Sequence, residues 1–239
     1  MMLVAVLTSR EVHGILRRTF SNVPHKLLFI LPSATIIATG YVKSFVTWPE
    51  GDILLYGISF TVLFLFAWSL MSGSDLRCFL LLIGSYIYTG IFPLLIVTLK
   101  WERSGNVLIY FLFFLVWMND SAAYFVGSFF GKRRGIFKVS PNKSLEGYIG
   151  GVIVTFVVAN IFKVLAGGWL PINYIEINLS AALLSITAPA GDLIESLLKR
   201  RAGVKDSSKM IPGFGGILDI FDSVLFSAPF YFTLIKVLL

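Results

Sequence analysis

Residues 107–130 read VLIYFLFFLVWMNDSAAYFVGSFF, an apolar run interrupted by the carboxylate of Asp120. The hydrocarbon core of a bilayer is about 30 Å thick, and a helix needs about 20 mostly apolar residues to cross it. A purely structural membrane helix would avoid a carboxylate in its interior. The run therefore predicts a membrane-spanning helix whose Asp120 faces a protein-lined cavity.

The rest of the chain has the same character. It is 56% hydrophobic with a mean hydropathy of +0.84, whereas a soluble domain has roughly 45–50% apolar residues. We therefore predict an all-α, polytopic integral membrane protein with about seven transmembrane helices, forming one domain over residues 1–239. The predicted spans are residues 26–46, 53–71, 76–99, 107–130, 145–165, 177–198 and 216–238, preceded by a cytoplasmic N-terminal segment, residues 1–26.

The basic residues indicate an orientation. Lys and Arg gather before the first predicted span, in 132–143 and in 199–209, whereas 48–52 and 167–176 contain none. Because cytoplasmic loops carry an excess of Lys and Arg, the N-terminus and both basic loops are predicted to be cytoplasmic. The same rule accounts for the net charge of +7, so no nucleic-acid partner is expected. The single cysteine, Cys78, excludes a disulfide framework and a Cys-based metal site.

The densest charge lies in residues 191–222, which read GDLIESLLKRRAGVKDSSKMIPGFGGILDIFD and hold five of the thirteen carboxylates. Asp192, Glu195, Ser196 and Lys199 are spaced i, i+3, i+4 and i+7, so they share one helical face. Such a face can hold a cation and a phosphate side by side. The alternative is that Glu195 and Lys199 form a simple i,i+4 pair at the membrane interface.

Two further elements follow in this stretch. The glycines of the loop 211–216 allow backbone N–H groups to approach a ligand closely. Asp219 and Asp222 then stand at i and i+3 near the start of the last helix. Capping of that helix is one reading of the two acids. Two carboxylates on one face also suit a hard cation, Mg²⁺ above all.

A fourth constellation lies upstream, in Ser140-Pro-Asn-Lys-Ser144 followed by Glu146. It is typical of a helix start, with Ser144 or Asn142 as the cap. Lys143, beside that helix N-terminus, could also contact a phosphate. Gly127 and Gly131 are too close together for a phosphate-binding Walker loop, and they favour close packing of helices.

The residue types restrict the reaction. Neither His13 nor His25 lies near the charged stretch, so the stretch offers no imidazole base. Phosphoryl or nucleotidyl transfer to a phosphate nucleophile needs no base, because the attacking oxygen is already anionic. Such a reaction depends on positioning and on neutralisation of charge by Mg²⁺ and Lys or Arg.

These motifs, which cover about residues 117–229, resemble those of the phosphatidate cytidylyltransferases (CDP-diacylglycerol synthases). The resemblance implies that CTP and phosphatidate react at the cytoplasmic side of a bacterial inner (plasma) membrane, giving CDP-diacylglycerol and pyrophosphate for phospholipid biosynthesis. It implies Mg²⁺, with room for a second cation, a surrounding of membrane lipid, and room for a homodimer. The site residues that it implies are Asp192, Asp219 and Asp222 for the metal; Lys199, Arg200, Lys205 and Asp206 for catalysis; and Asp120, Lys143, Ser196, Gly213, Gly215 and Gly216 for substrate binding.

The chain departs from the family pattern at Phe214, where the family has His, and at Ile220, where it has Arg. It also begins where typical members have already passed one or two membrane helices. These departures keep two alternatives open: a degenerate relative that binds lipid or nucleotide without turnover, and a CTP-dependent kinase of a polyprenol-type alcohol. The kinase would need a base for the hydroxyl group, and the sequence shows none.

Overall fold

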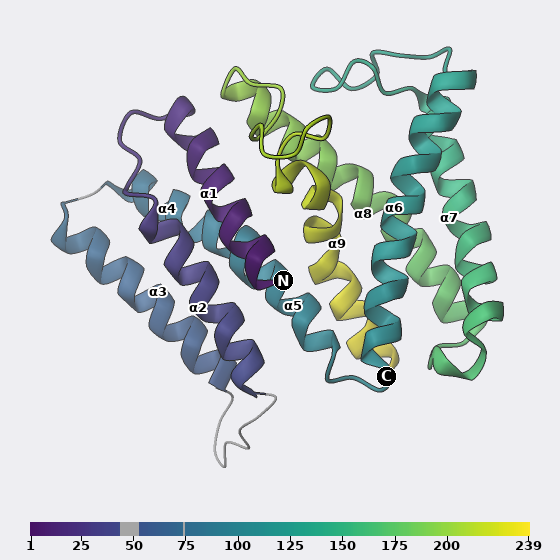
Figure 1. Cartoon of the computed structure of the whole chain (residues 1–239), viewed down its shortest axis with the longest axis horizontal. Coiled ribbons are helices and arrows are strands. Elements are labelled where there is room, and N and C mark those ends of the chain that lie inside the picture. Colours follow the sequence, from purple (N-terminus) through teal and green to yellow (C-terminus); the bar gives the residue numbers. More distant parts are fainter. Residues whose placement is uncertain (44–52, 74) are drawn as a thin grey trace. The chain divides into compact units, whose positions relative to one another are not determined.

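The computed structural model describes residues 1–43, 53–73 and 75–239, and these parts are almost entirely helical (Figure 1). The chain is divided into two compact units by its packing. Unit 1 comprises Met1–Thr98 and Arg201–Ile220, and unit 2 comprises Leu99–Arg200 and Phe221–Leu239. The all-α prediction is confirmed. The single-domain organisation stays a prediction.

Unit 1 is built around the N-terminal helices, which pack on one another in sequence order. The first of them lies in the segment predicted only as a cytoplasmic N-terminus, and its helical structure was not foreseen. It buries one face that includes Ala5, Val12 and Ile15. The helices are α1 (Met2–Thr19), α2 (Leu27–Lys43), α3 (Ile53–Met71), α4 (Leu76–Tyr86), the π-helical turn η1 (Ile87–Ile91) and α5 (Phe92–Leu99).

Three buried hydroxyl groups tie α1, α2 and η1 together. Thr89 Oγ1 lies 2.8 Å from Ser9 Oγ and 3.0 Å from Ser33 Oγ. Gly90 lets the backbones approach, because a Cβ there would lie 3.2 Å from the Cα of Ser33. Hydrogen bonds between helices and small residues at their contact are the usual means of helix association in membranes.

Unit 2 contains the long helices α6 (Gly105–Phe130), α7 (Leu145–Ala166), α8 (Tyr174–Arg201) and most of α9 (Ile217–Leu238), with a 3₁₀ turn, η2 (Gly167–Trp169), after α7. Helices α6 and α7 lie side by side (Figure 1). A Cβ on Gly147 would lie 2.6 Å from the carbonyl oxygen of Ala123, and one on Gly127 would lie 3.0 Å from Ser144 Oγ. The close packing predicted for Gly127 is confirmed.

Polar contacts hold the remaining helices of unit 2. Asn119 Nδ2 on α6 donates to Thr155 Oγ1 on α7 at 2.9 Å, and Thr187 Oγ1 on α8 donates to Ser227 Oγ on α9 at 3.0 Å. Gly191 lets α8 approach α9, because a Cβ there would lie 2.8 Å from the carbonyl oxygen of Asp222. These contacts set α8 and α9 against each other at the height of the predicted acidic residues.

Six helices of the described chain are long and apolar enough to cross a membrane, and the protein is a membrane protein. They match six of the seven predicted spans. The seventh, 26–46, holds α2, which is a shorter apolar helix in the described residues, so the count of seven is not confirmed. Residues 44–46 of that span, and the loop 48–52 used for the orientation, lie outside the described residues. The cytoplasmic orientation stays a prediction. The six spans are Ile53–Met71, Leu76–Leu99, Gly105–Phe130, Leu145–Trp169, Tyr174–Arg201 and Ile217–Leu238.

Candidate functional site

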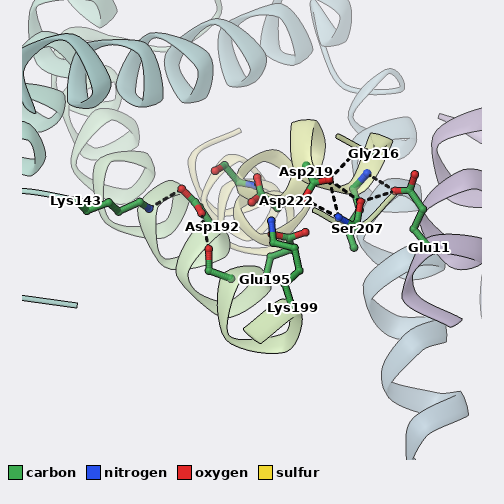
Figure 2. A network of polar contacts seen from close by, with 12 residues as sticks. Glu11, Lys143, Asp192, Glu195, Lys199, Ser207, Gly216, Asp219 and Asp222 are labelled. Atoms are coloured by element: carbon green, nitrogen blue, oxygen red, sulfur yellow. Dashed lines mark hydrogen bonds and ion pairs between the residues drawn. The ribbon is translucent and has the colours of Figure 1, made fainter. Parts of the chain in front are cut away.

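Helix α8 carries two polar pairs at its C-terminal half (Figure 2). Ser196 Oγ donates to Asp192 Oδ1 at 3.2 Å, one turn back along the helix. Lys199 forms an ion pair with Glu195 at the same spacing. The predicted i,i+4 pair therefore exists. It does not lie at a wet interface, however, because the Glu195 side chain is fully buried.

Two more carboxylates face α8 within unit 2. Asp222, on α9, is 6% exposed and lies within electrostatic range of Asp192, Asp120 and Lys199. Asp120, on α6, interacts with Asp192, with Lys143 and with Ser223. The structure thus brings together residues from three helices and one loop that the sequence predicted separately. We call this group the acidic cluster: Asp120, Lys143, Asp192, Glu195, Ser196, Lys199, Asp222 and Ser223.

A cavity of about 510 Å³ opens at one side of the acidic cluster. Its polar wall includes Asp120, Lys143 and Asp192, and the ammonium of Lys143 lies 2.5 Å from Asp192 Oδ2. A cavity of this size with convergent charged groups, in a unit made of apolar helices, is a default ligand site. Its lining residues are Asn119, Asp120, Ala123, Tyr124, Gly127, Ser128, Arg134, Phe137, Asn142, Lys143, Ser144, Tyr148, Pro189 and Asp192.

The loop before α7 is held by caps, which fixes where Lys143 stands. Ser144 is the N-cap, and its Oγ accepts from the backbone N–H of Gly147 at 3.1 Å. Of the two predicted cap residues, Ser144 is the one observed. Glu146 accepts from the backbone N–H groups of Lys132 and Arg133. Because these bonds anchor both ends of the basic loop, Lys143 enters the cavity from a fixed backbone.

The Pro-Gly loop belongs to unit 1, and its glycines serve a tight turn. Gly213 and Gly215 adopt φ of +84° and +93°, and the backbones of Ile211 and Gly215 bond each other in both directions. Asp219, at the start of α9, accepts from the N–H of Gly216 at 2.6 Å. It also accepts from the backbone N–H and hydroxyl of Ser207 at 2.9 and 2.7 Å.

These bonds show Asp219 in the capping role that the sequence left open. They do not test its predicted metal role, which stays a prediction. The same holds for ligand binding by Gly215 and Gly216, whose N–H groups already bind Ile211 and Asp219 in this structure. Lys205 and Asp206 lie in the same loop with exposed side chains.

The residues present were compared with the needs of Mg²⁺. Among the described residues, no three His, Cys, Asp or Glu side chains stand close enough together to hold a metal ion. Mg²⁺ usually takes one or two carboxylates and completes its shell with water and substrate phosphate. Asp192 and Asp222, which face each other across α8 and α9 in unit 2, supply a donor set of that kind. The acidic cluster therefore fits the ion.

A family model described as the cytidylyltransferase family matches residues 1–238, the whole motif-bearing half included. The chain belongs to the cytidylyltransferase family. It is 44% identical over 150 residues to the phosphatidate cytidylyltransferase of Bacillus subtilis, a match that covers 62% of this chain and 55% of that one. It is 46% identical over 132 residues to that of Haemophilus influenzae, covering 53% and 45%. The corresponding figures for the Thermotoga maritima protein of that name are 42% over 125 residues, 51% and 46%.

This cytidylyltransferase-family chain spans about half the length of the curated relatives it matches. The resemblance drawn from the motifs is thus confirmed at the level of the family. Sequence reasoning had gathered Asp120, Lys143 and Asp192 for one site, and the structure places all three on one cavity.

Several residues of the site were not foreseen. Tyr148, Phe137 and Arg134 line the cavity, but nothing in their local pattern distinguishes them from ordinary apolar or loop residues. Glu11 was missed as well, although it has a signal. It is the only acidic residue before Glu50, and an acid in a short apolar stretch of a membrane protein usually has a function.

Proposed function

We propose that this protein transfers the cytidylyl group of CTP to phosphatidate, giving CDP-diacylglycerol and pyrophosphate. The observation that carries the proposal is the cavity of about 510 Å³ lined by Asp120, Lys143 and Asp192. The family and the names of its relatives, each a phosphatidate cytidylyltransferase, support the same reaction. A polar cavity among membrane-spanning helices suits a substrate pair of which one is a lipid and the other a polar nucleotide.

The bond changes follow from the two substrates. A phosphate oxygen of phosphatidate attacks the α-phosphorus of CTP and forms the new P–O bond, while the bond from that phosphorus to the bridging oxygen of the β-phosphate breaks. Pyrophosphate carries away the electron pair. The attacking oxygen is anionic at neutral pH, so no side chain has to remove a proton.

The protein then has to position two anions and offset their charge. The ammonium groups of Lys143 and Lys199 stand on opposite sides of the Asp192 carboxylate's helix, one from the loop before α7 and one on α8. Lys143 exchanges its partner Asp192 for a substrate phosphate when the nucleotide enters. Asp192 and Asp222 would hold Mg²⁺, which supplies charge neutralisation at the phosphates. Preorganised charges of this kind act strongly because the surroundings exclude water.

The electrostatic environment argues against the two alternatives. A kinase of a polyprenol-type alcohol needs a base for the hydroxyl group, and neither His13 nor His25 belongs to the unit that holds the acidic cluster. A binder without turnover has no need for two buried carboxylates such as Glu195 and Asp222, whose burial is costly in free energy.

The test is a direct assay of the purified protein in detergent with labelled CTP, phosphatidate and Mg²⁺. CDP-diacylglycerol is the expected product, formed only with both substrates and with the metal. Replacing phosphatidate by a polyprenol distinguishes the kinase, because a kinase would label nothing from α-labelled CTP and would release CDP. Binding of CTP without any product would establish the degenerate relative and overturn the proposal. Asp192→Asn serves as the inactive control.

A further inference from the structure

Glu11 is an acidic residue of α1 that no motif includes. Its side chain is buried, with 7% exposure, and it belongs to unit 1 together with the loop 201–220. A buried carboxylate is costly unless it is paired or hydrogen-bonded. Its partners therefore show what the residue does.

Both oxygens of this carboxylate accept hydrogen bonds from the Pro-Gly loop region (Figure 2). Oε1 accepts from Ser208 Oγ at 2.7 Å and from the N–H of Ile217 at 3.1 Å. Oε2 accepts from Ser207 Oγ at 3.1 Å and from the N–H of Leu218 at 2.7 Å. A carboxylate offers about four lone-pair positions, so Glu11 is fully engaged with this one segment.

Two of these bonds cap α9 from another helix. The first N–H groups of a helix have no partner within the helix, and a side chain at the preceding residue usually accepts from one of them. Here the preceding residue is Gly216, which has no side chain. A Cβ at Gly216 would lie 2.5 Å from Glu11 Oε1 and closer still to Ser207 Oγ. The missing side chain is what makes room for the carboxylate of Glu11.

The other two bonds hold the segment next to the predicted catalytic residues. Ser207 directly follows Lys205 and Asp206, and its hydroxyl group lies between Glu11 Oε2 and Asp219 Oδ2. Gly215 is also constrained, because a Cβ there would lie 2.5 Å from Asp219 Oδ2. The two carboxylates thus fix the start and the end of the segment 207–218.

We infer that Glu11 is a positioning residue of this transferase, which holds the segment 205–218 in the arrangement that Lys205 and Asp206 need for the reaction. The inference rests on the proposed function. A helix N-terminus attracts anions, and Glu11 fills that of α9 with an anion of the protein's own. Gly216 is therefore required for this carboxylate, in addition to any contact with substrate.

Glu11→Gln tests the inference, because it keeps the shape of the side chain and replaces one acceptor oxygen by an NH₂ group that faces donors. The matched control is Ser9→Ala on the same helix. Ser9 is fully buried as well, but its hydroxyl contacts Thr89 and not the segment 205–218. We expect Glu11→Gln to lower kcat/KM about 100-fold, the cost of a misplacement of about 1 Å, and Ser9→Ala to lower it less than threefold at a similar loss of thermal stability. A Glu11→Gln protein within threefold of wild type overturns the inference.

Hydrogen exchange gives a readout that needs no turnover. The amides of Ile217 and Leu218 should exchange faster in Glu11→Gln than in wild type, and unchanged in Ser9→Ala. Unchanged exchange in Glu11→Gln overturns the inference even if the enzyme proves inactive. If wild type makes no CDP-diacylglycerol but the exchange increases, the proposed function fails and the positioning by Glu11 stands.

A second variant keeps the test decisive if Glu11→Gln does not fold. Gly216→Ala leaves Glu11 in the chain and displaces its carboxylate by crowding. The same faster exchange and the same fall in kcat/KM are expected. Gly14→Ala on α1, where a Cβ would meet nothing within 4 Å, is the matched control and should resemble wild type. Equal behaviour of Gly216→Ala and Gly14→Ala contradicts the role of Glu11.

Discussion

The ammonium of Lys143 lies 2.5 Å from the carboxylate of Asp192, which joins the loop before α7 to the C-terminal half of α8. Both side chains are about one-third exposed and both line the cavity. A half-exposed pair of this kind contributes little to stability. Its position at the cavity gives it a different value, because each partner is available to a substrate that carries phosphate and metal.

Lys143→Met should therefore reduce catalysis more than stability. The variant keeps the apolar stem and removes the charge that faces the phosphates, and loss of one such group costs about 10²–10³ in rate. The rate of CDP-diacylglycerol formation and the thermal midpoint in detergent measure the two effects. Lys138→Met, at an exposed position of the same loop, is the control and should keep nearly full activity. A Lys143→Met protein within twofold of wild type would show that the ion pair is only structural.

Asp222→Asn and Asp219→Asn should behave differently, although the two acids stand one turn apart on α9. Asp222 faces Asp120, Asp192 and Lys199 inside unit 2, so its loss should lower the rate about 10²-fold or more and raise the Mg²⁺ concentration needed for half-maximal rate. Asp219 accepts from Ser207 and Gly216. Since hydrogen bonds to a charged group contribute about 1.5–3 kcal/mol each, Asp219→Asn should mainly lower the thermal midpoint.

The comparison is made by titrating Mg²⁺ against the rate for both variants and wild type at a temperature where all three are folded. A curve for Asp222→Asn that coincides with that of wild type would exclude Asp222 as a metal ligand. A large shift in the curve for Asp219→Asn would establish that the cap is also a ligand.

The two acids also show how far the sequence leads. Spacing of i, i+3 places both on one side of a helix, and it confirms nothing about which way each carboxylate turns. In Asp219 it turns back to the helix start, because the N–H of Gly216 is unsatisfied there. In Asp222 it turns toward α8. Each choice depends on a neighbour that is not local in sequence.

Long apolar windows were predictable, since length and hydropathy alone decide whether a helix can cross a bilayer. The cap at Ser144 was predictable too, because its signal lies within a few residues. Glu11 was not, because its four donors lie 196 to 207 residues away, and no periodicity links positions so distant. The α1 helix was missed for a related reason: its apolar part is short and its burial comes from packing on α2 and η1.

Gly147→Ala should weaken both the α6–α7 contact and the site. The added Cβ would lie 2.6 Å from the carbonyl oxygen of Ala123 and 3.0 Å from the Cα of Gly127, so the helices must separate. Overpacking of this kind costs about 1–3 kcal/mol. Since Ala123 and Gly127 line the cavity, activity should fall as well.

Thermal midpoints of this variant and of Gly84→Ala, measured in the same detergent, provide the check. A Cβ at Gly84 in α4 would meet nothing within 4 Å, and replacing a helical Gly by Ala typically stabilises by about 0.5–1 kcal/mol. Opposite shifts are therefore expected. If both variants shift in the same direction, the close approach of α6 and α7 does not limit stability.

Phe214→His should raise activity at little cost in stability. The ring of Phe214 is 71% exposed, so its loss removes little buried apolar surface. The family resemblance places a His at this position in the Pro-Gly loop, and an imidazole there would return one polar group to a substrate phosphate. A charge-assisted hydrogen bond contributes about 1.5–3 kcal/mol, which corresponds to a rate increase of about 10-fold or more.

The single variant is compared with wild type and with Phe214→His combined with Ile220→Arg, in one assay of CDP-diacylglycerol formation. A further increase in the double variant would show that wild type is an enzyme slowed at two positions, because each substitution returns a polar group that the family pattern contains. An unchanged rate in both variants would contradict the prediction and show that this chain binds its phosphates through other groups, with Lys143 and Lys199 as the first candidates, since both stand in the acidic cluster.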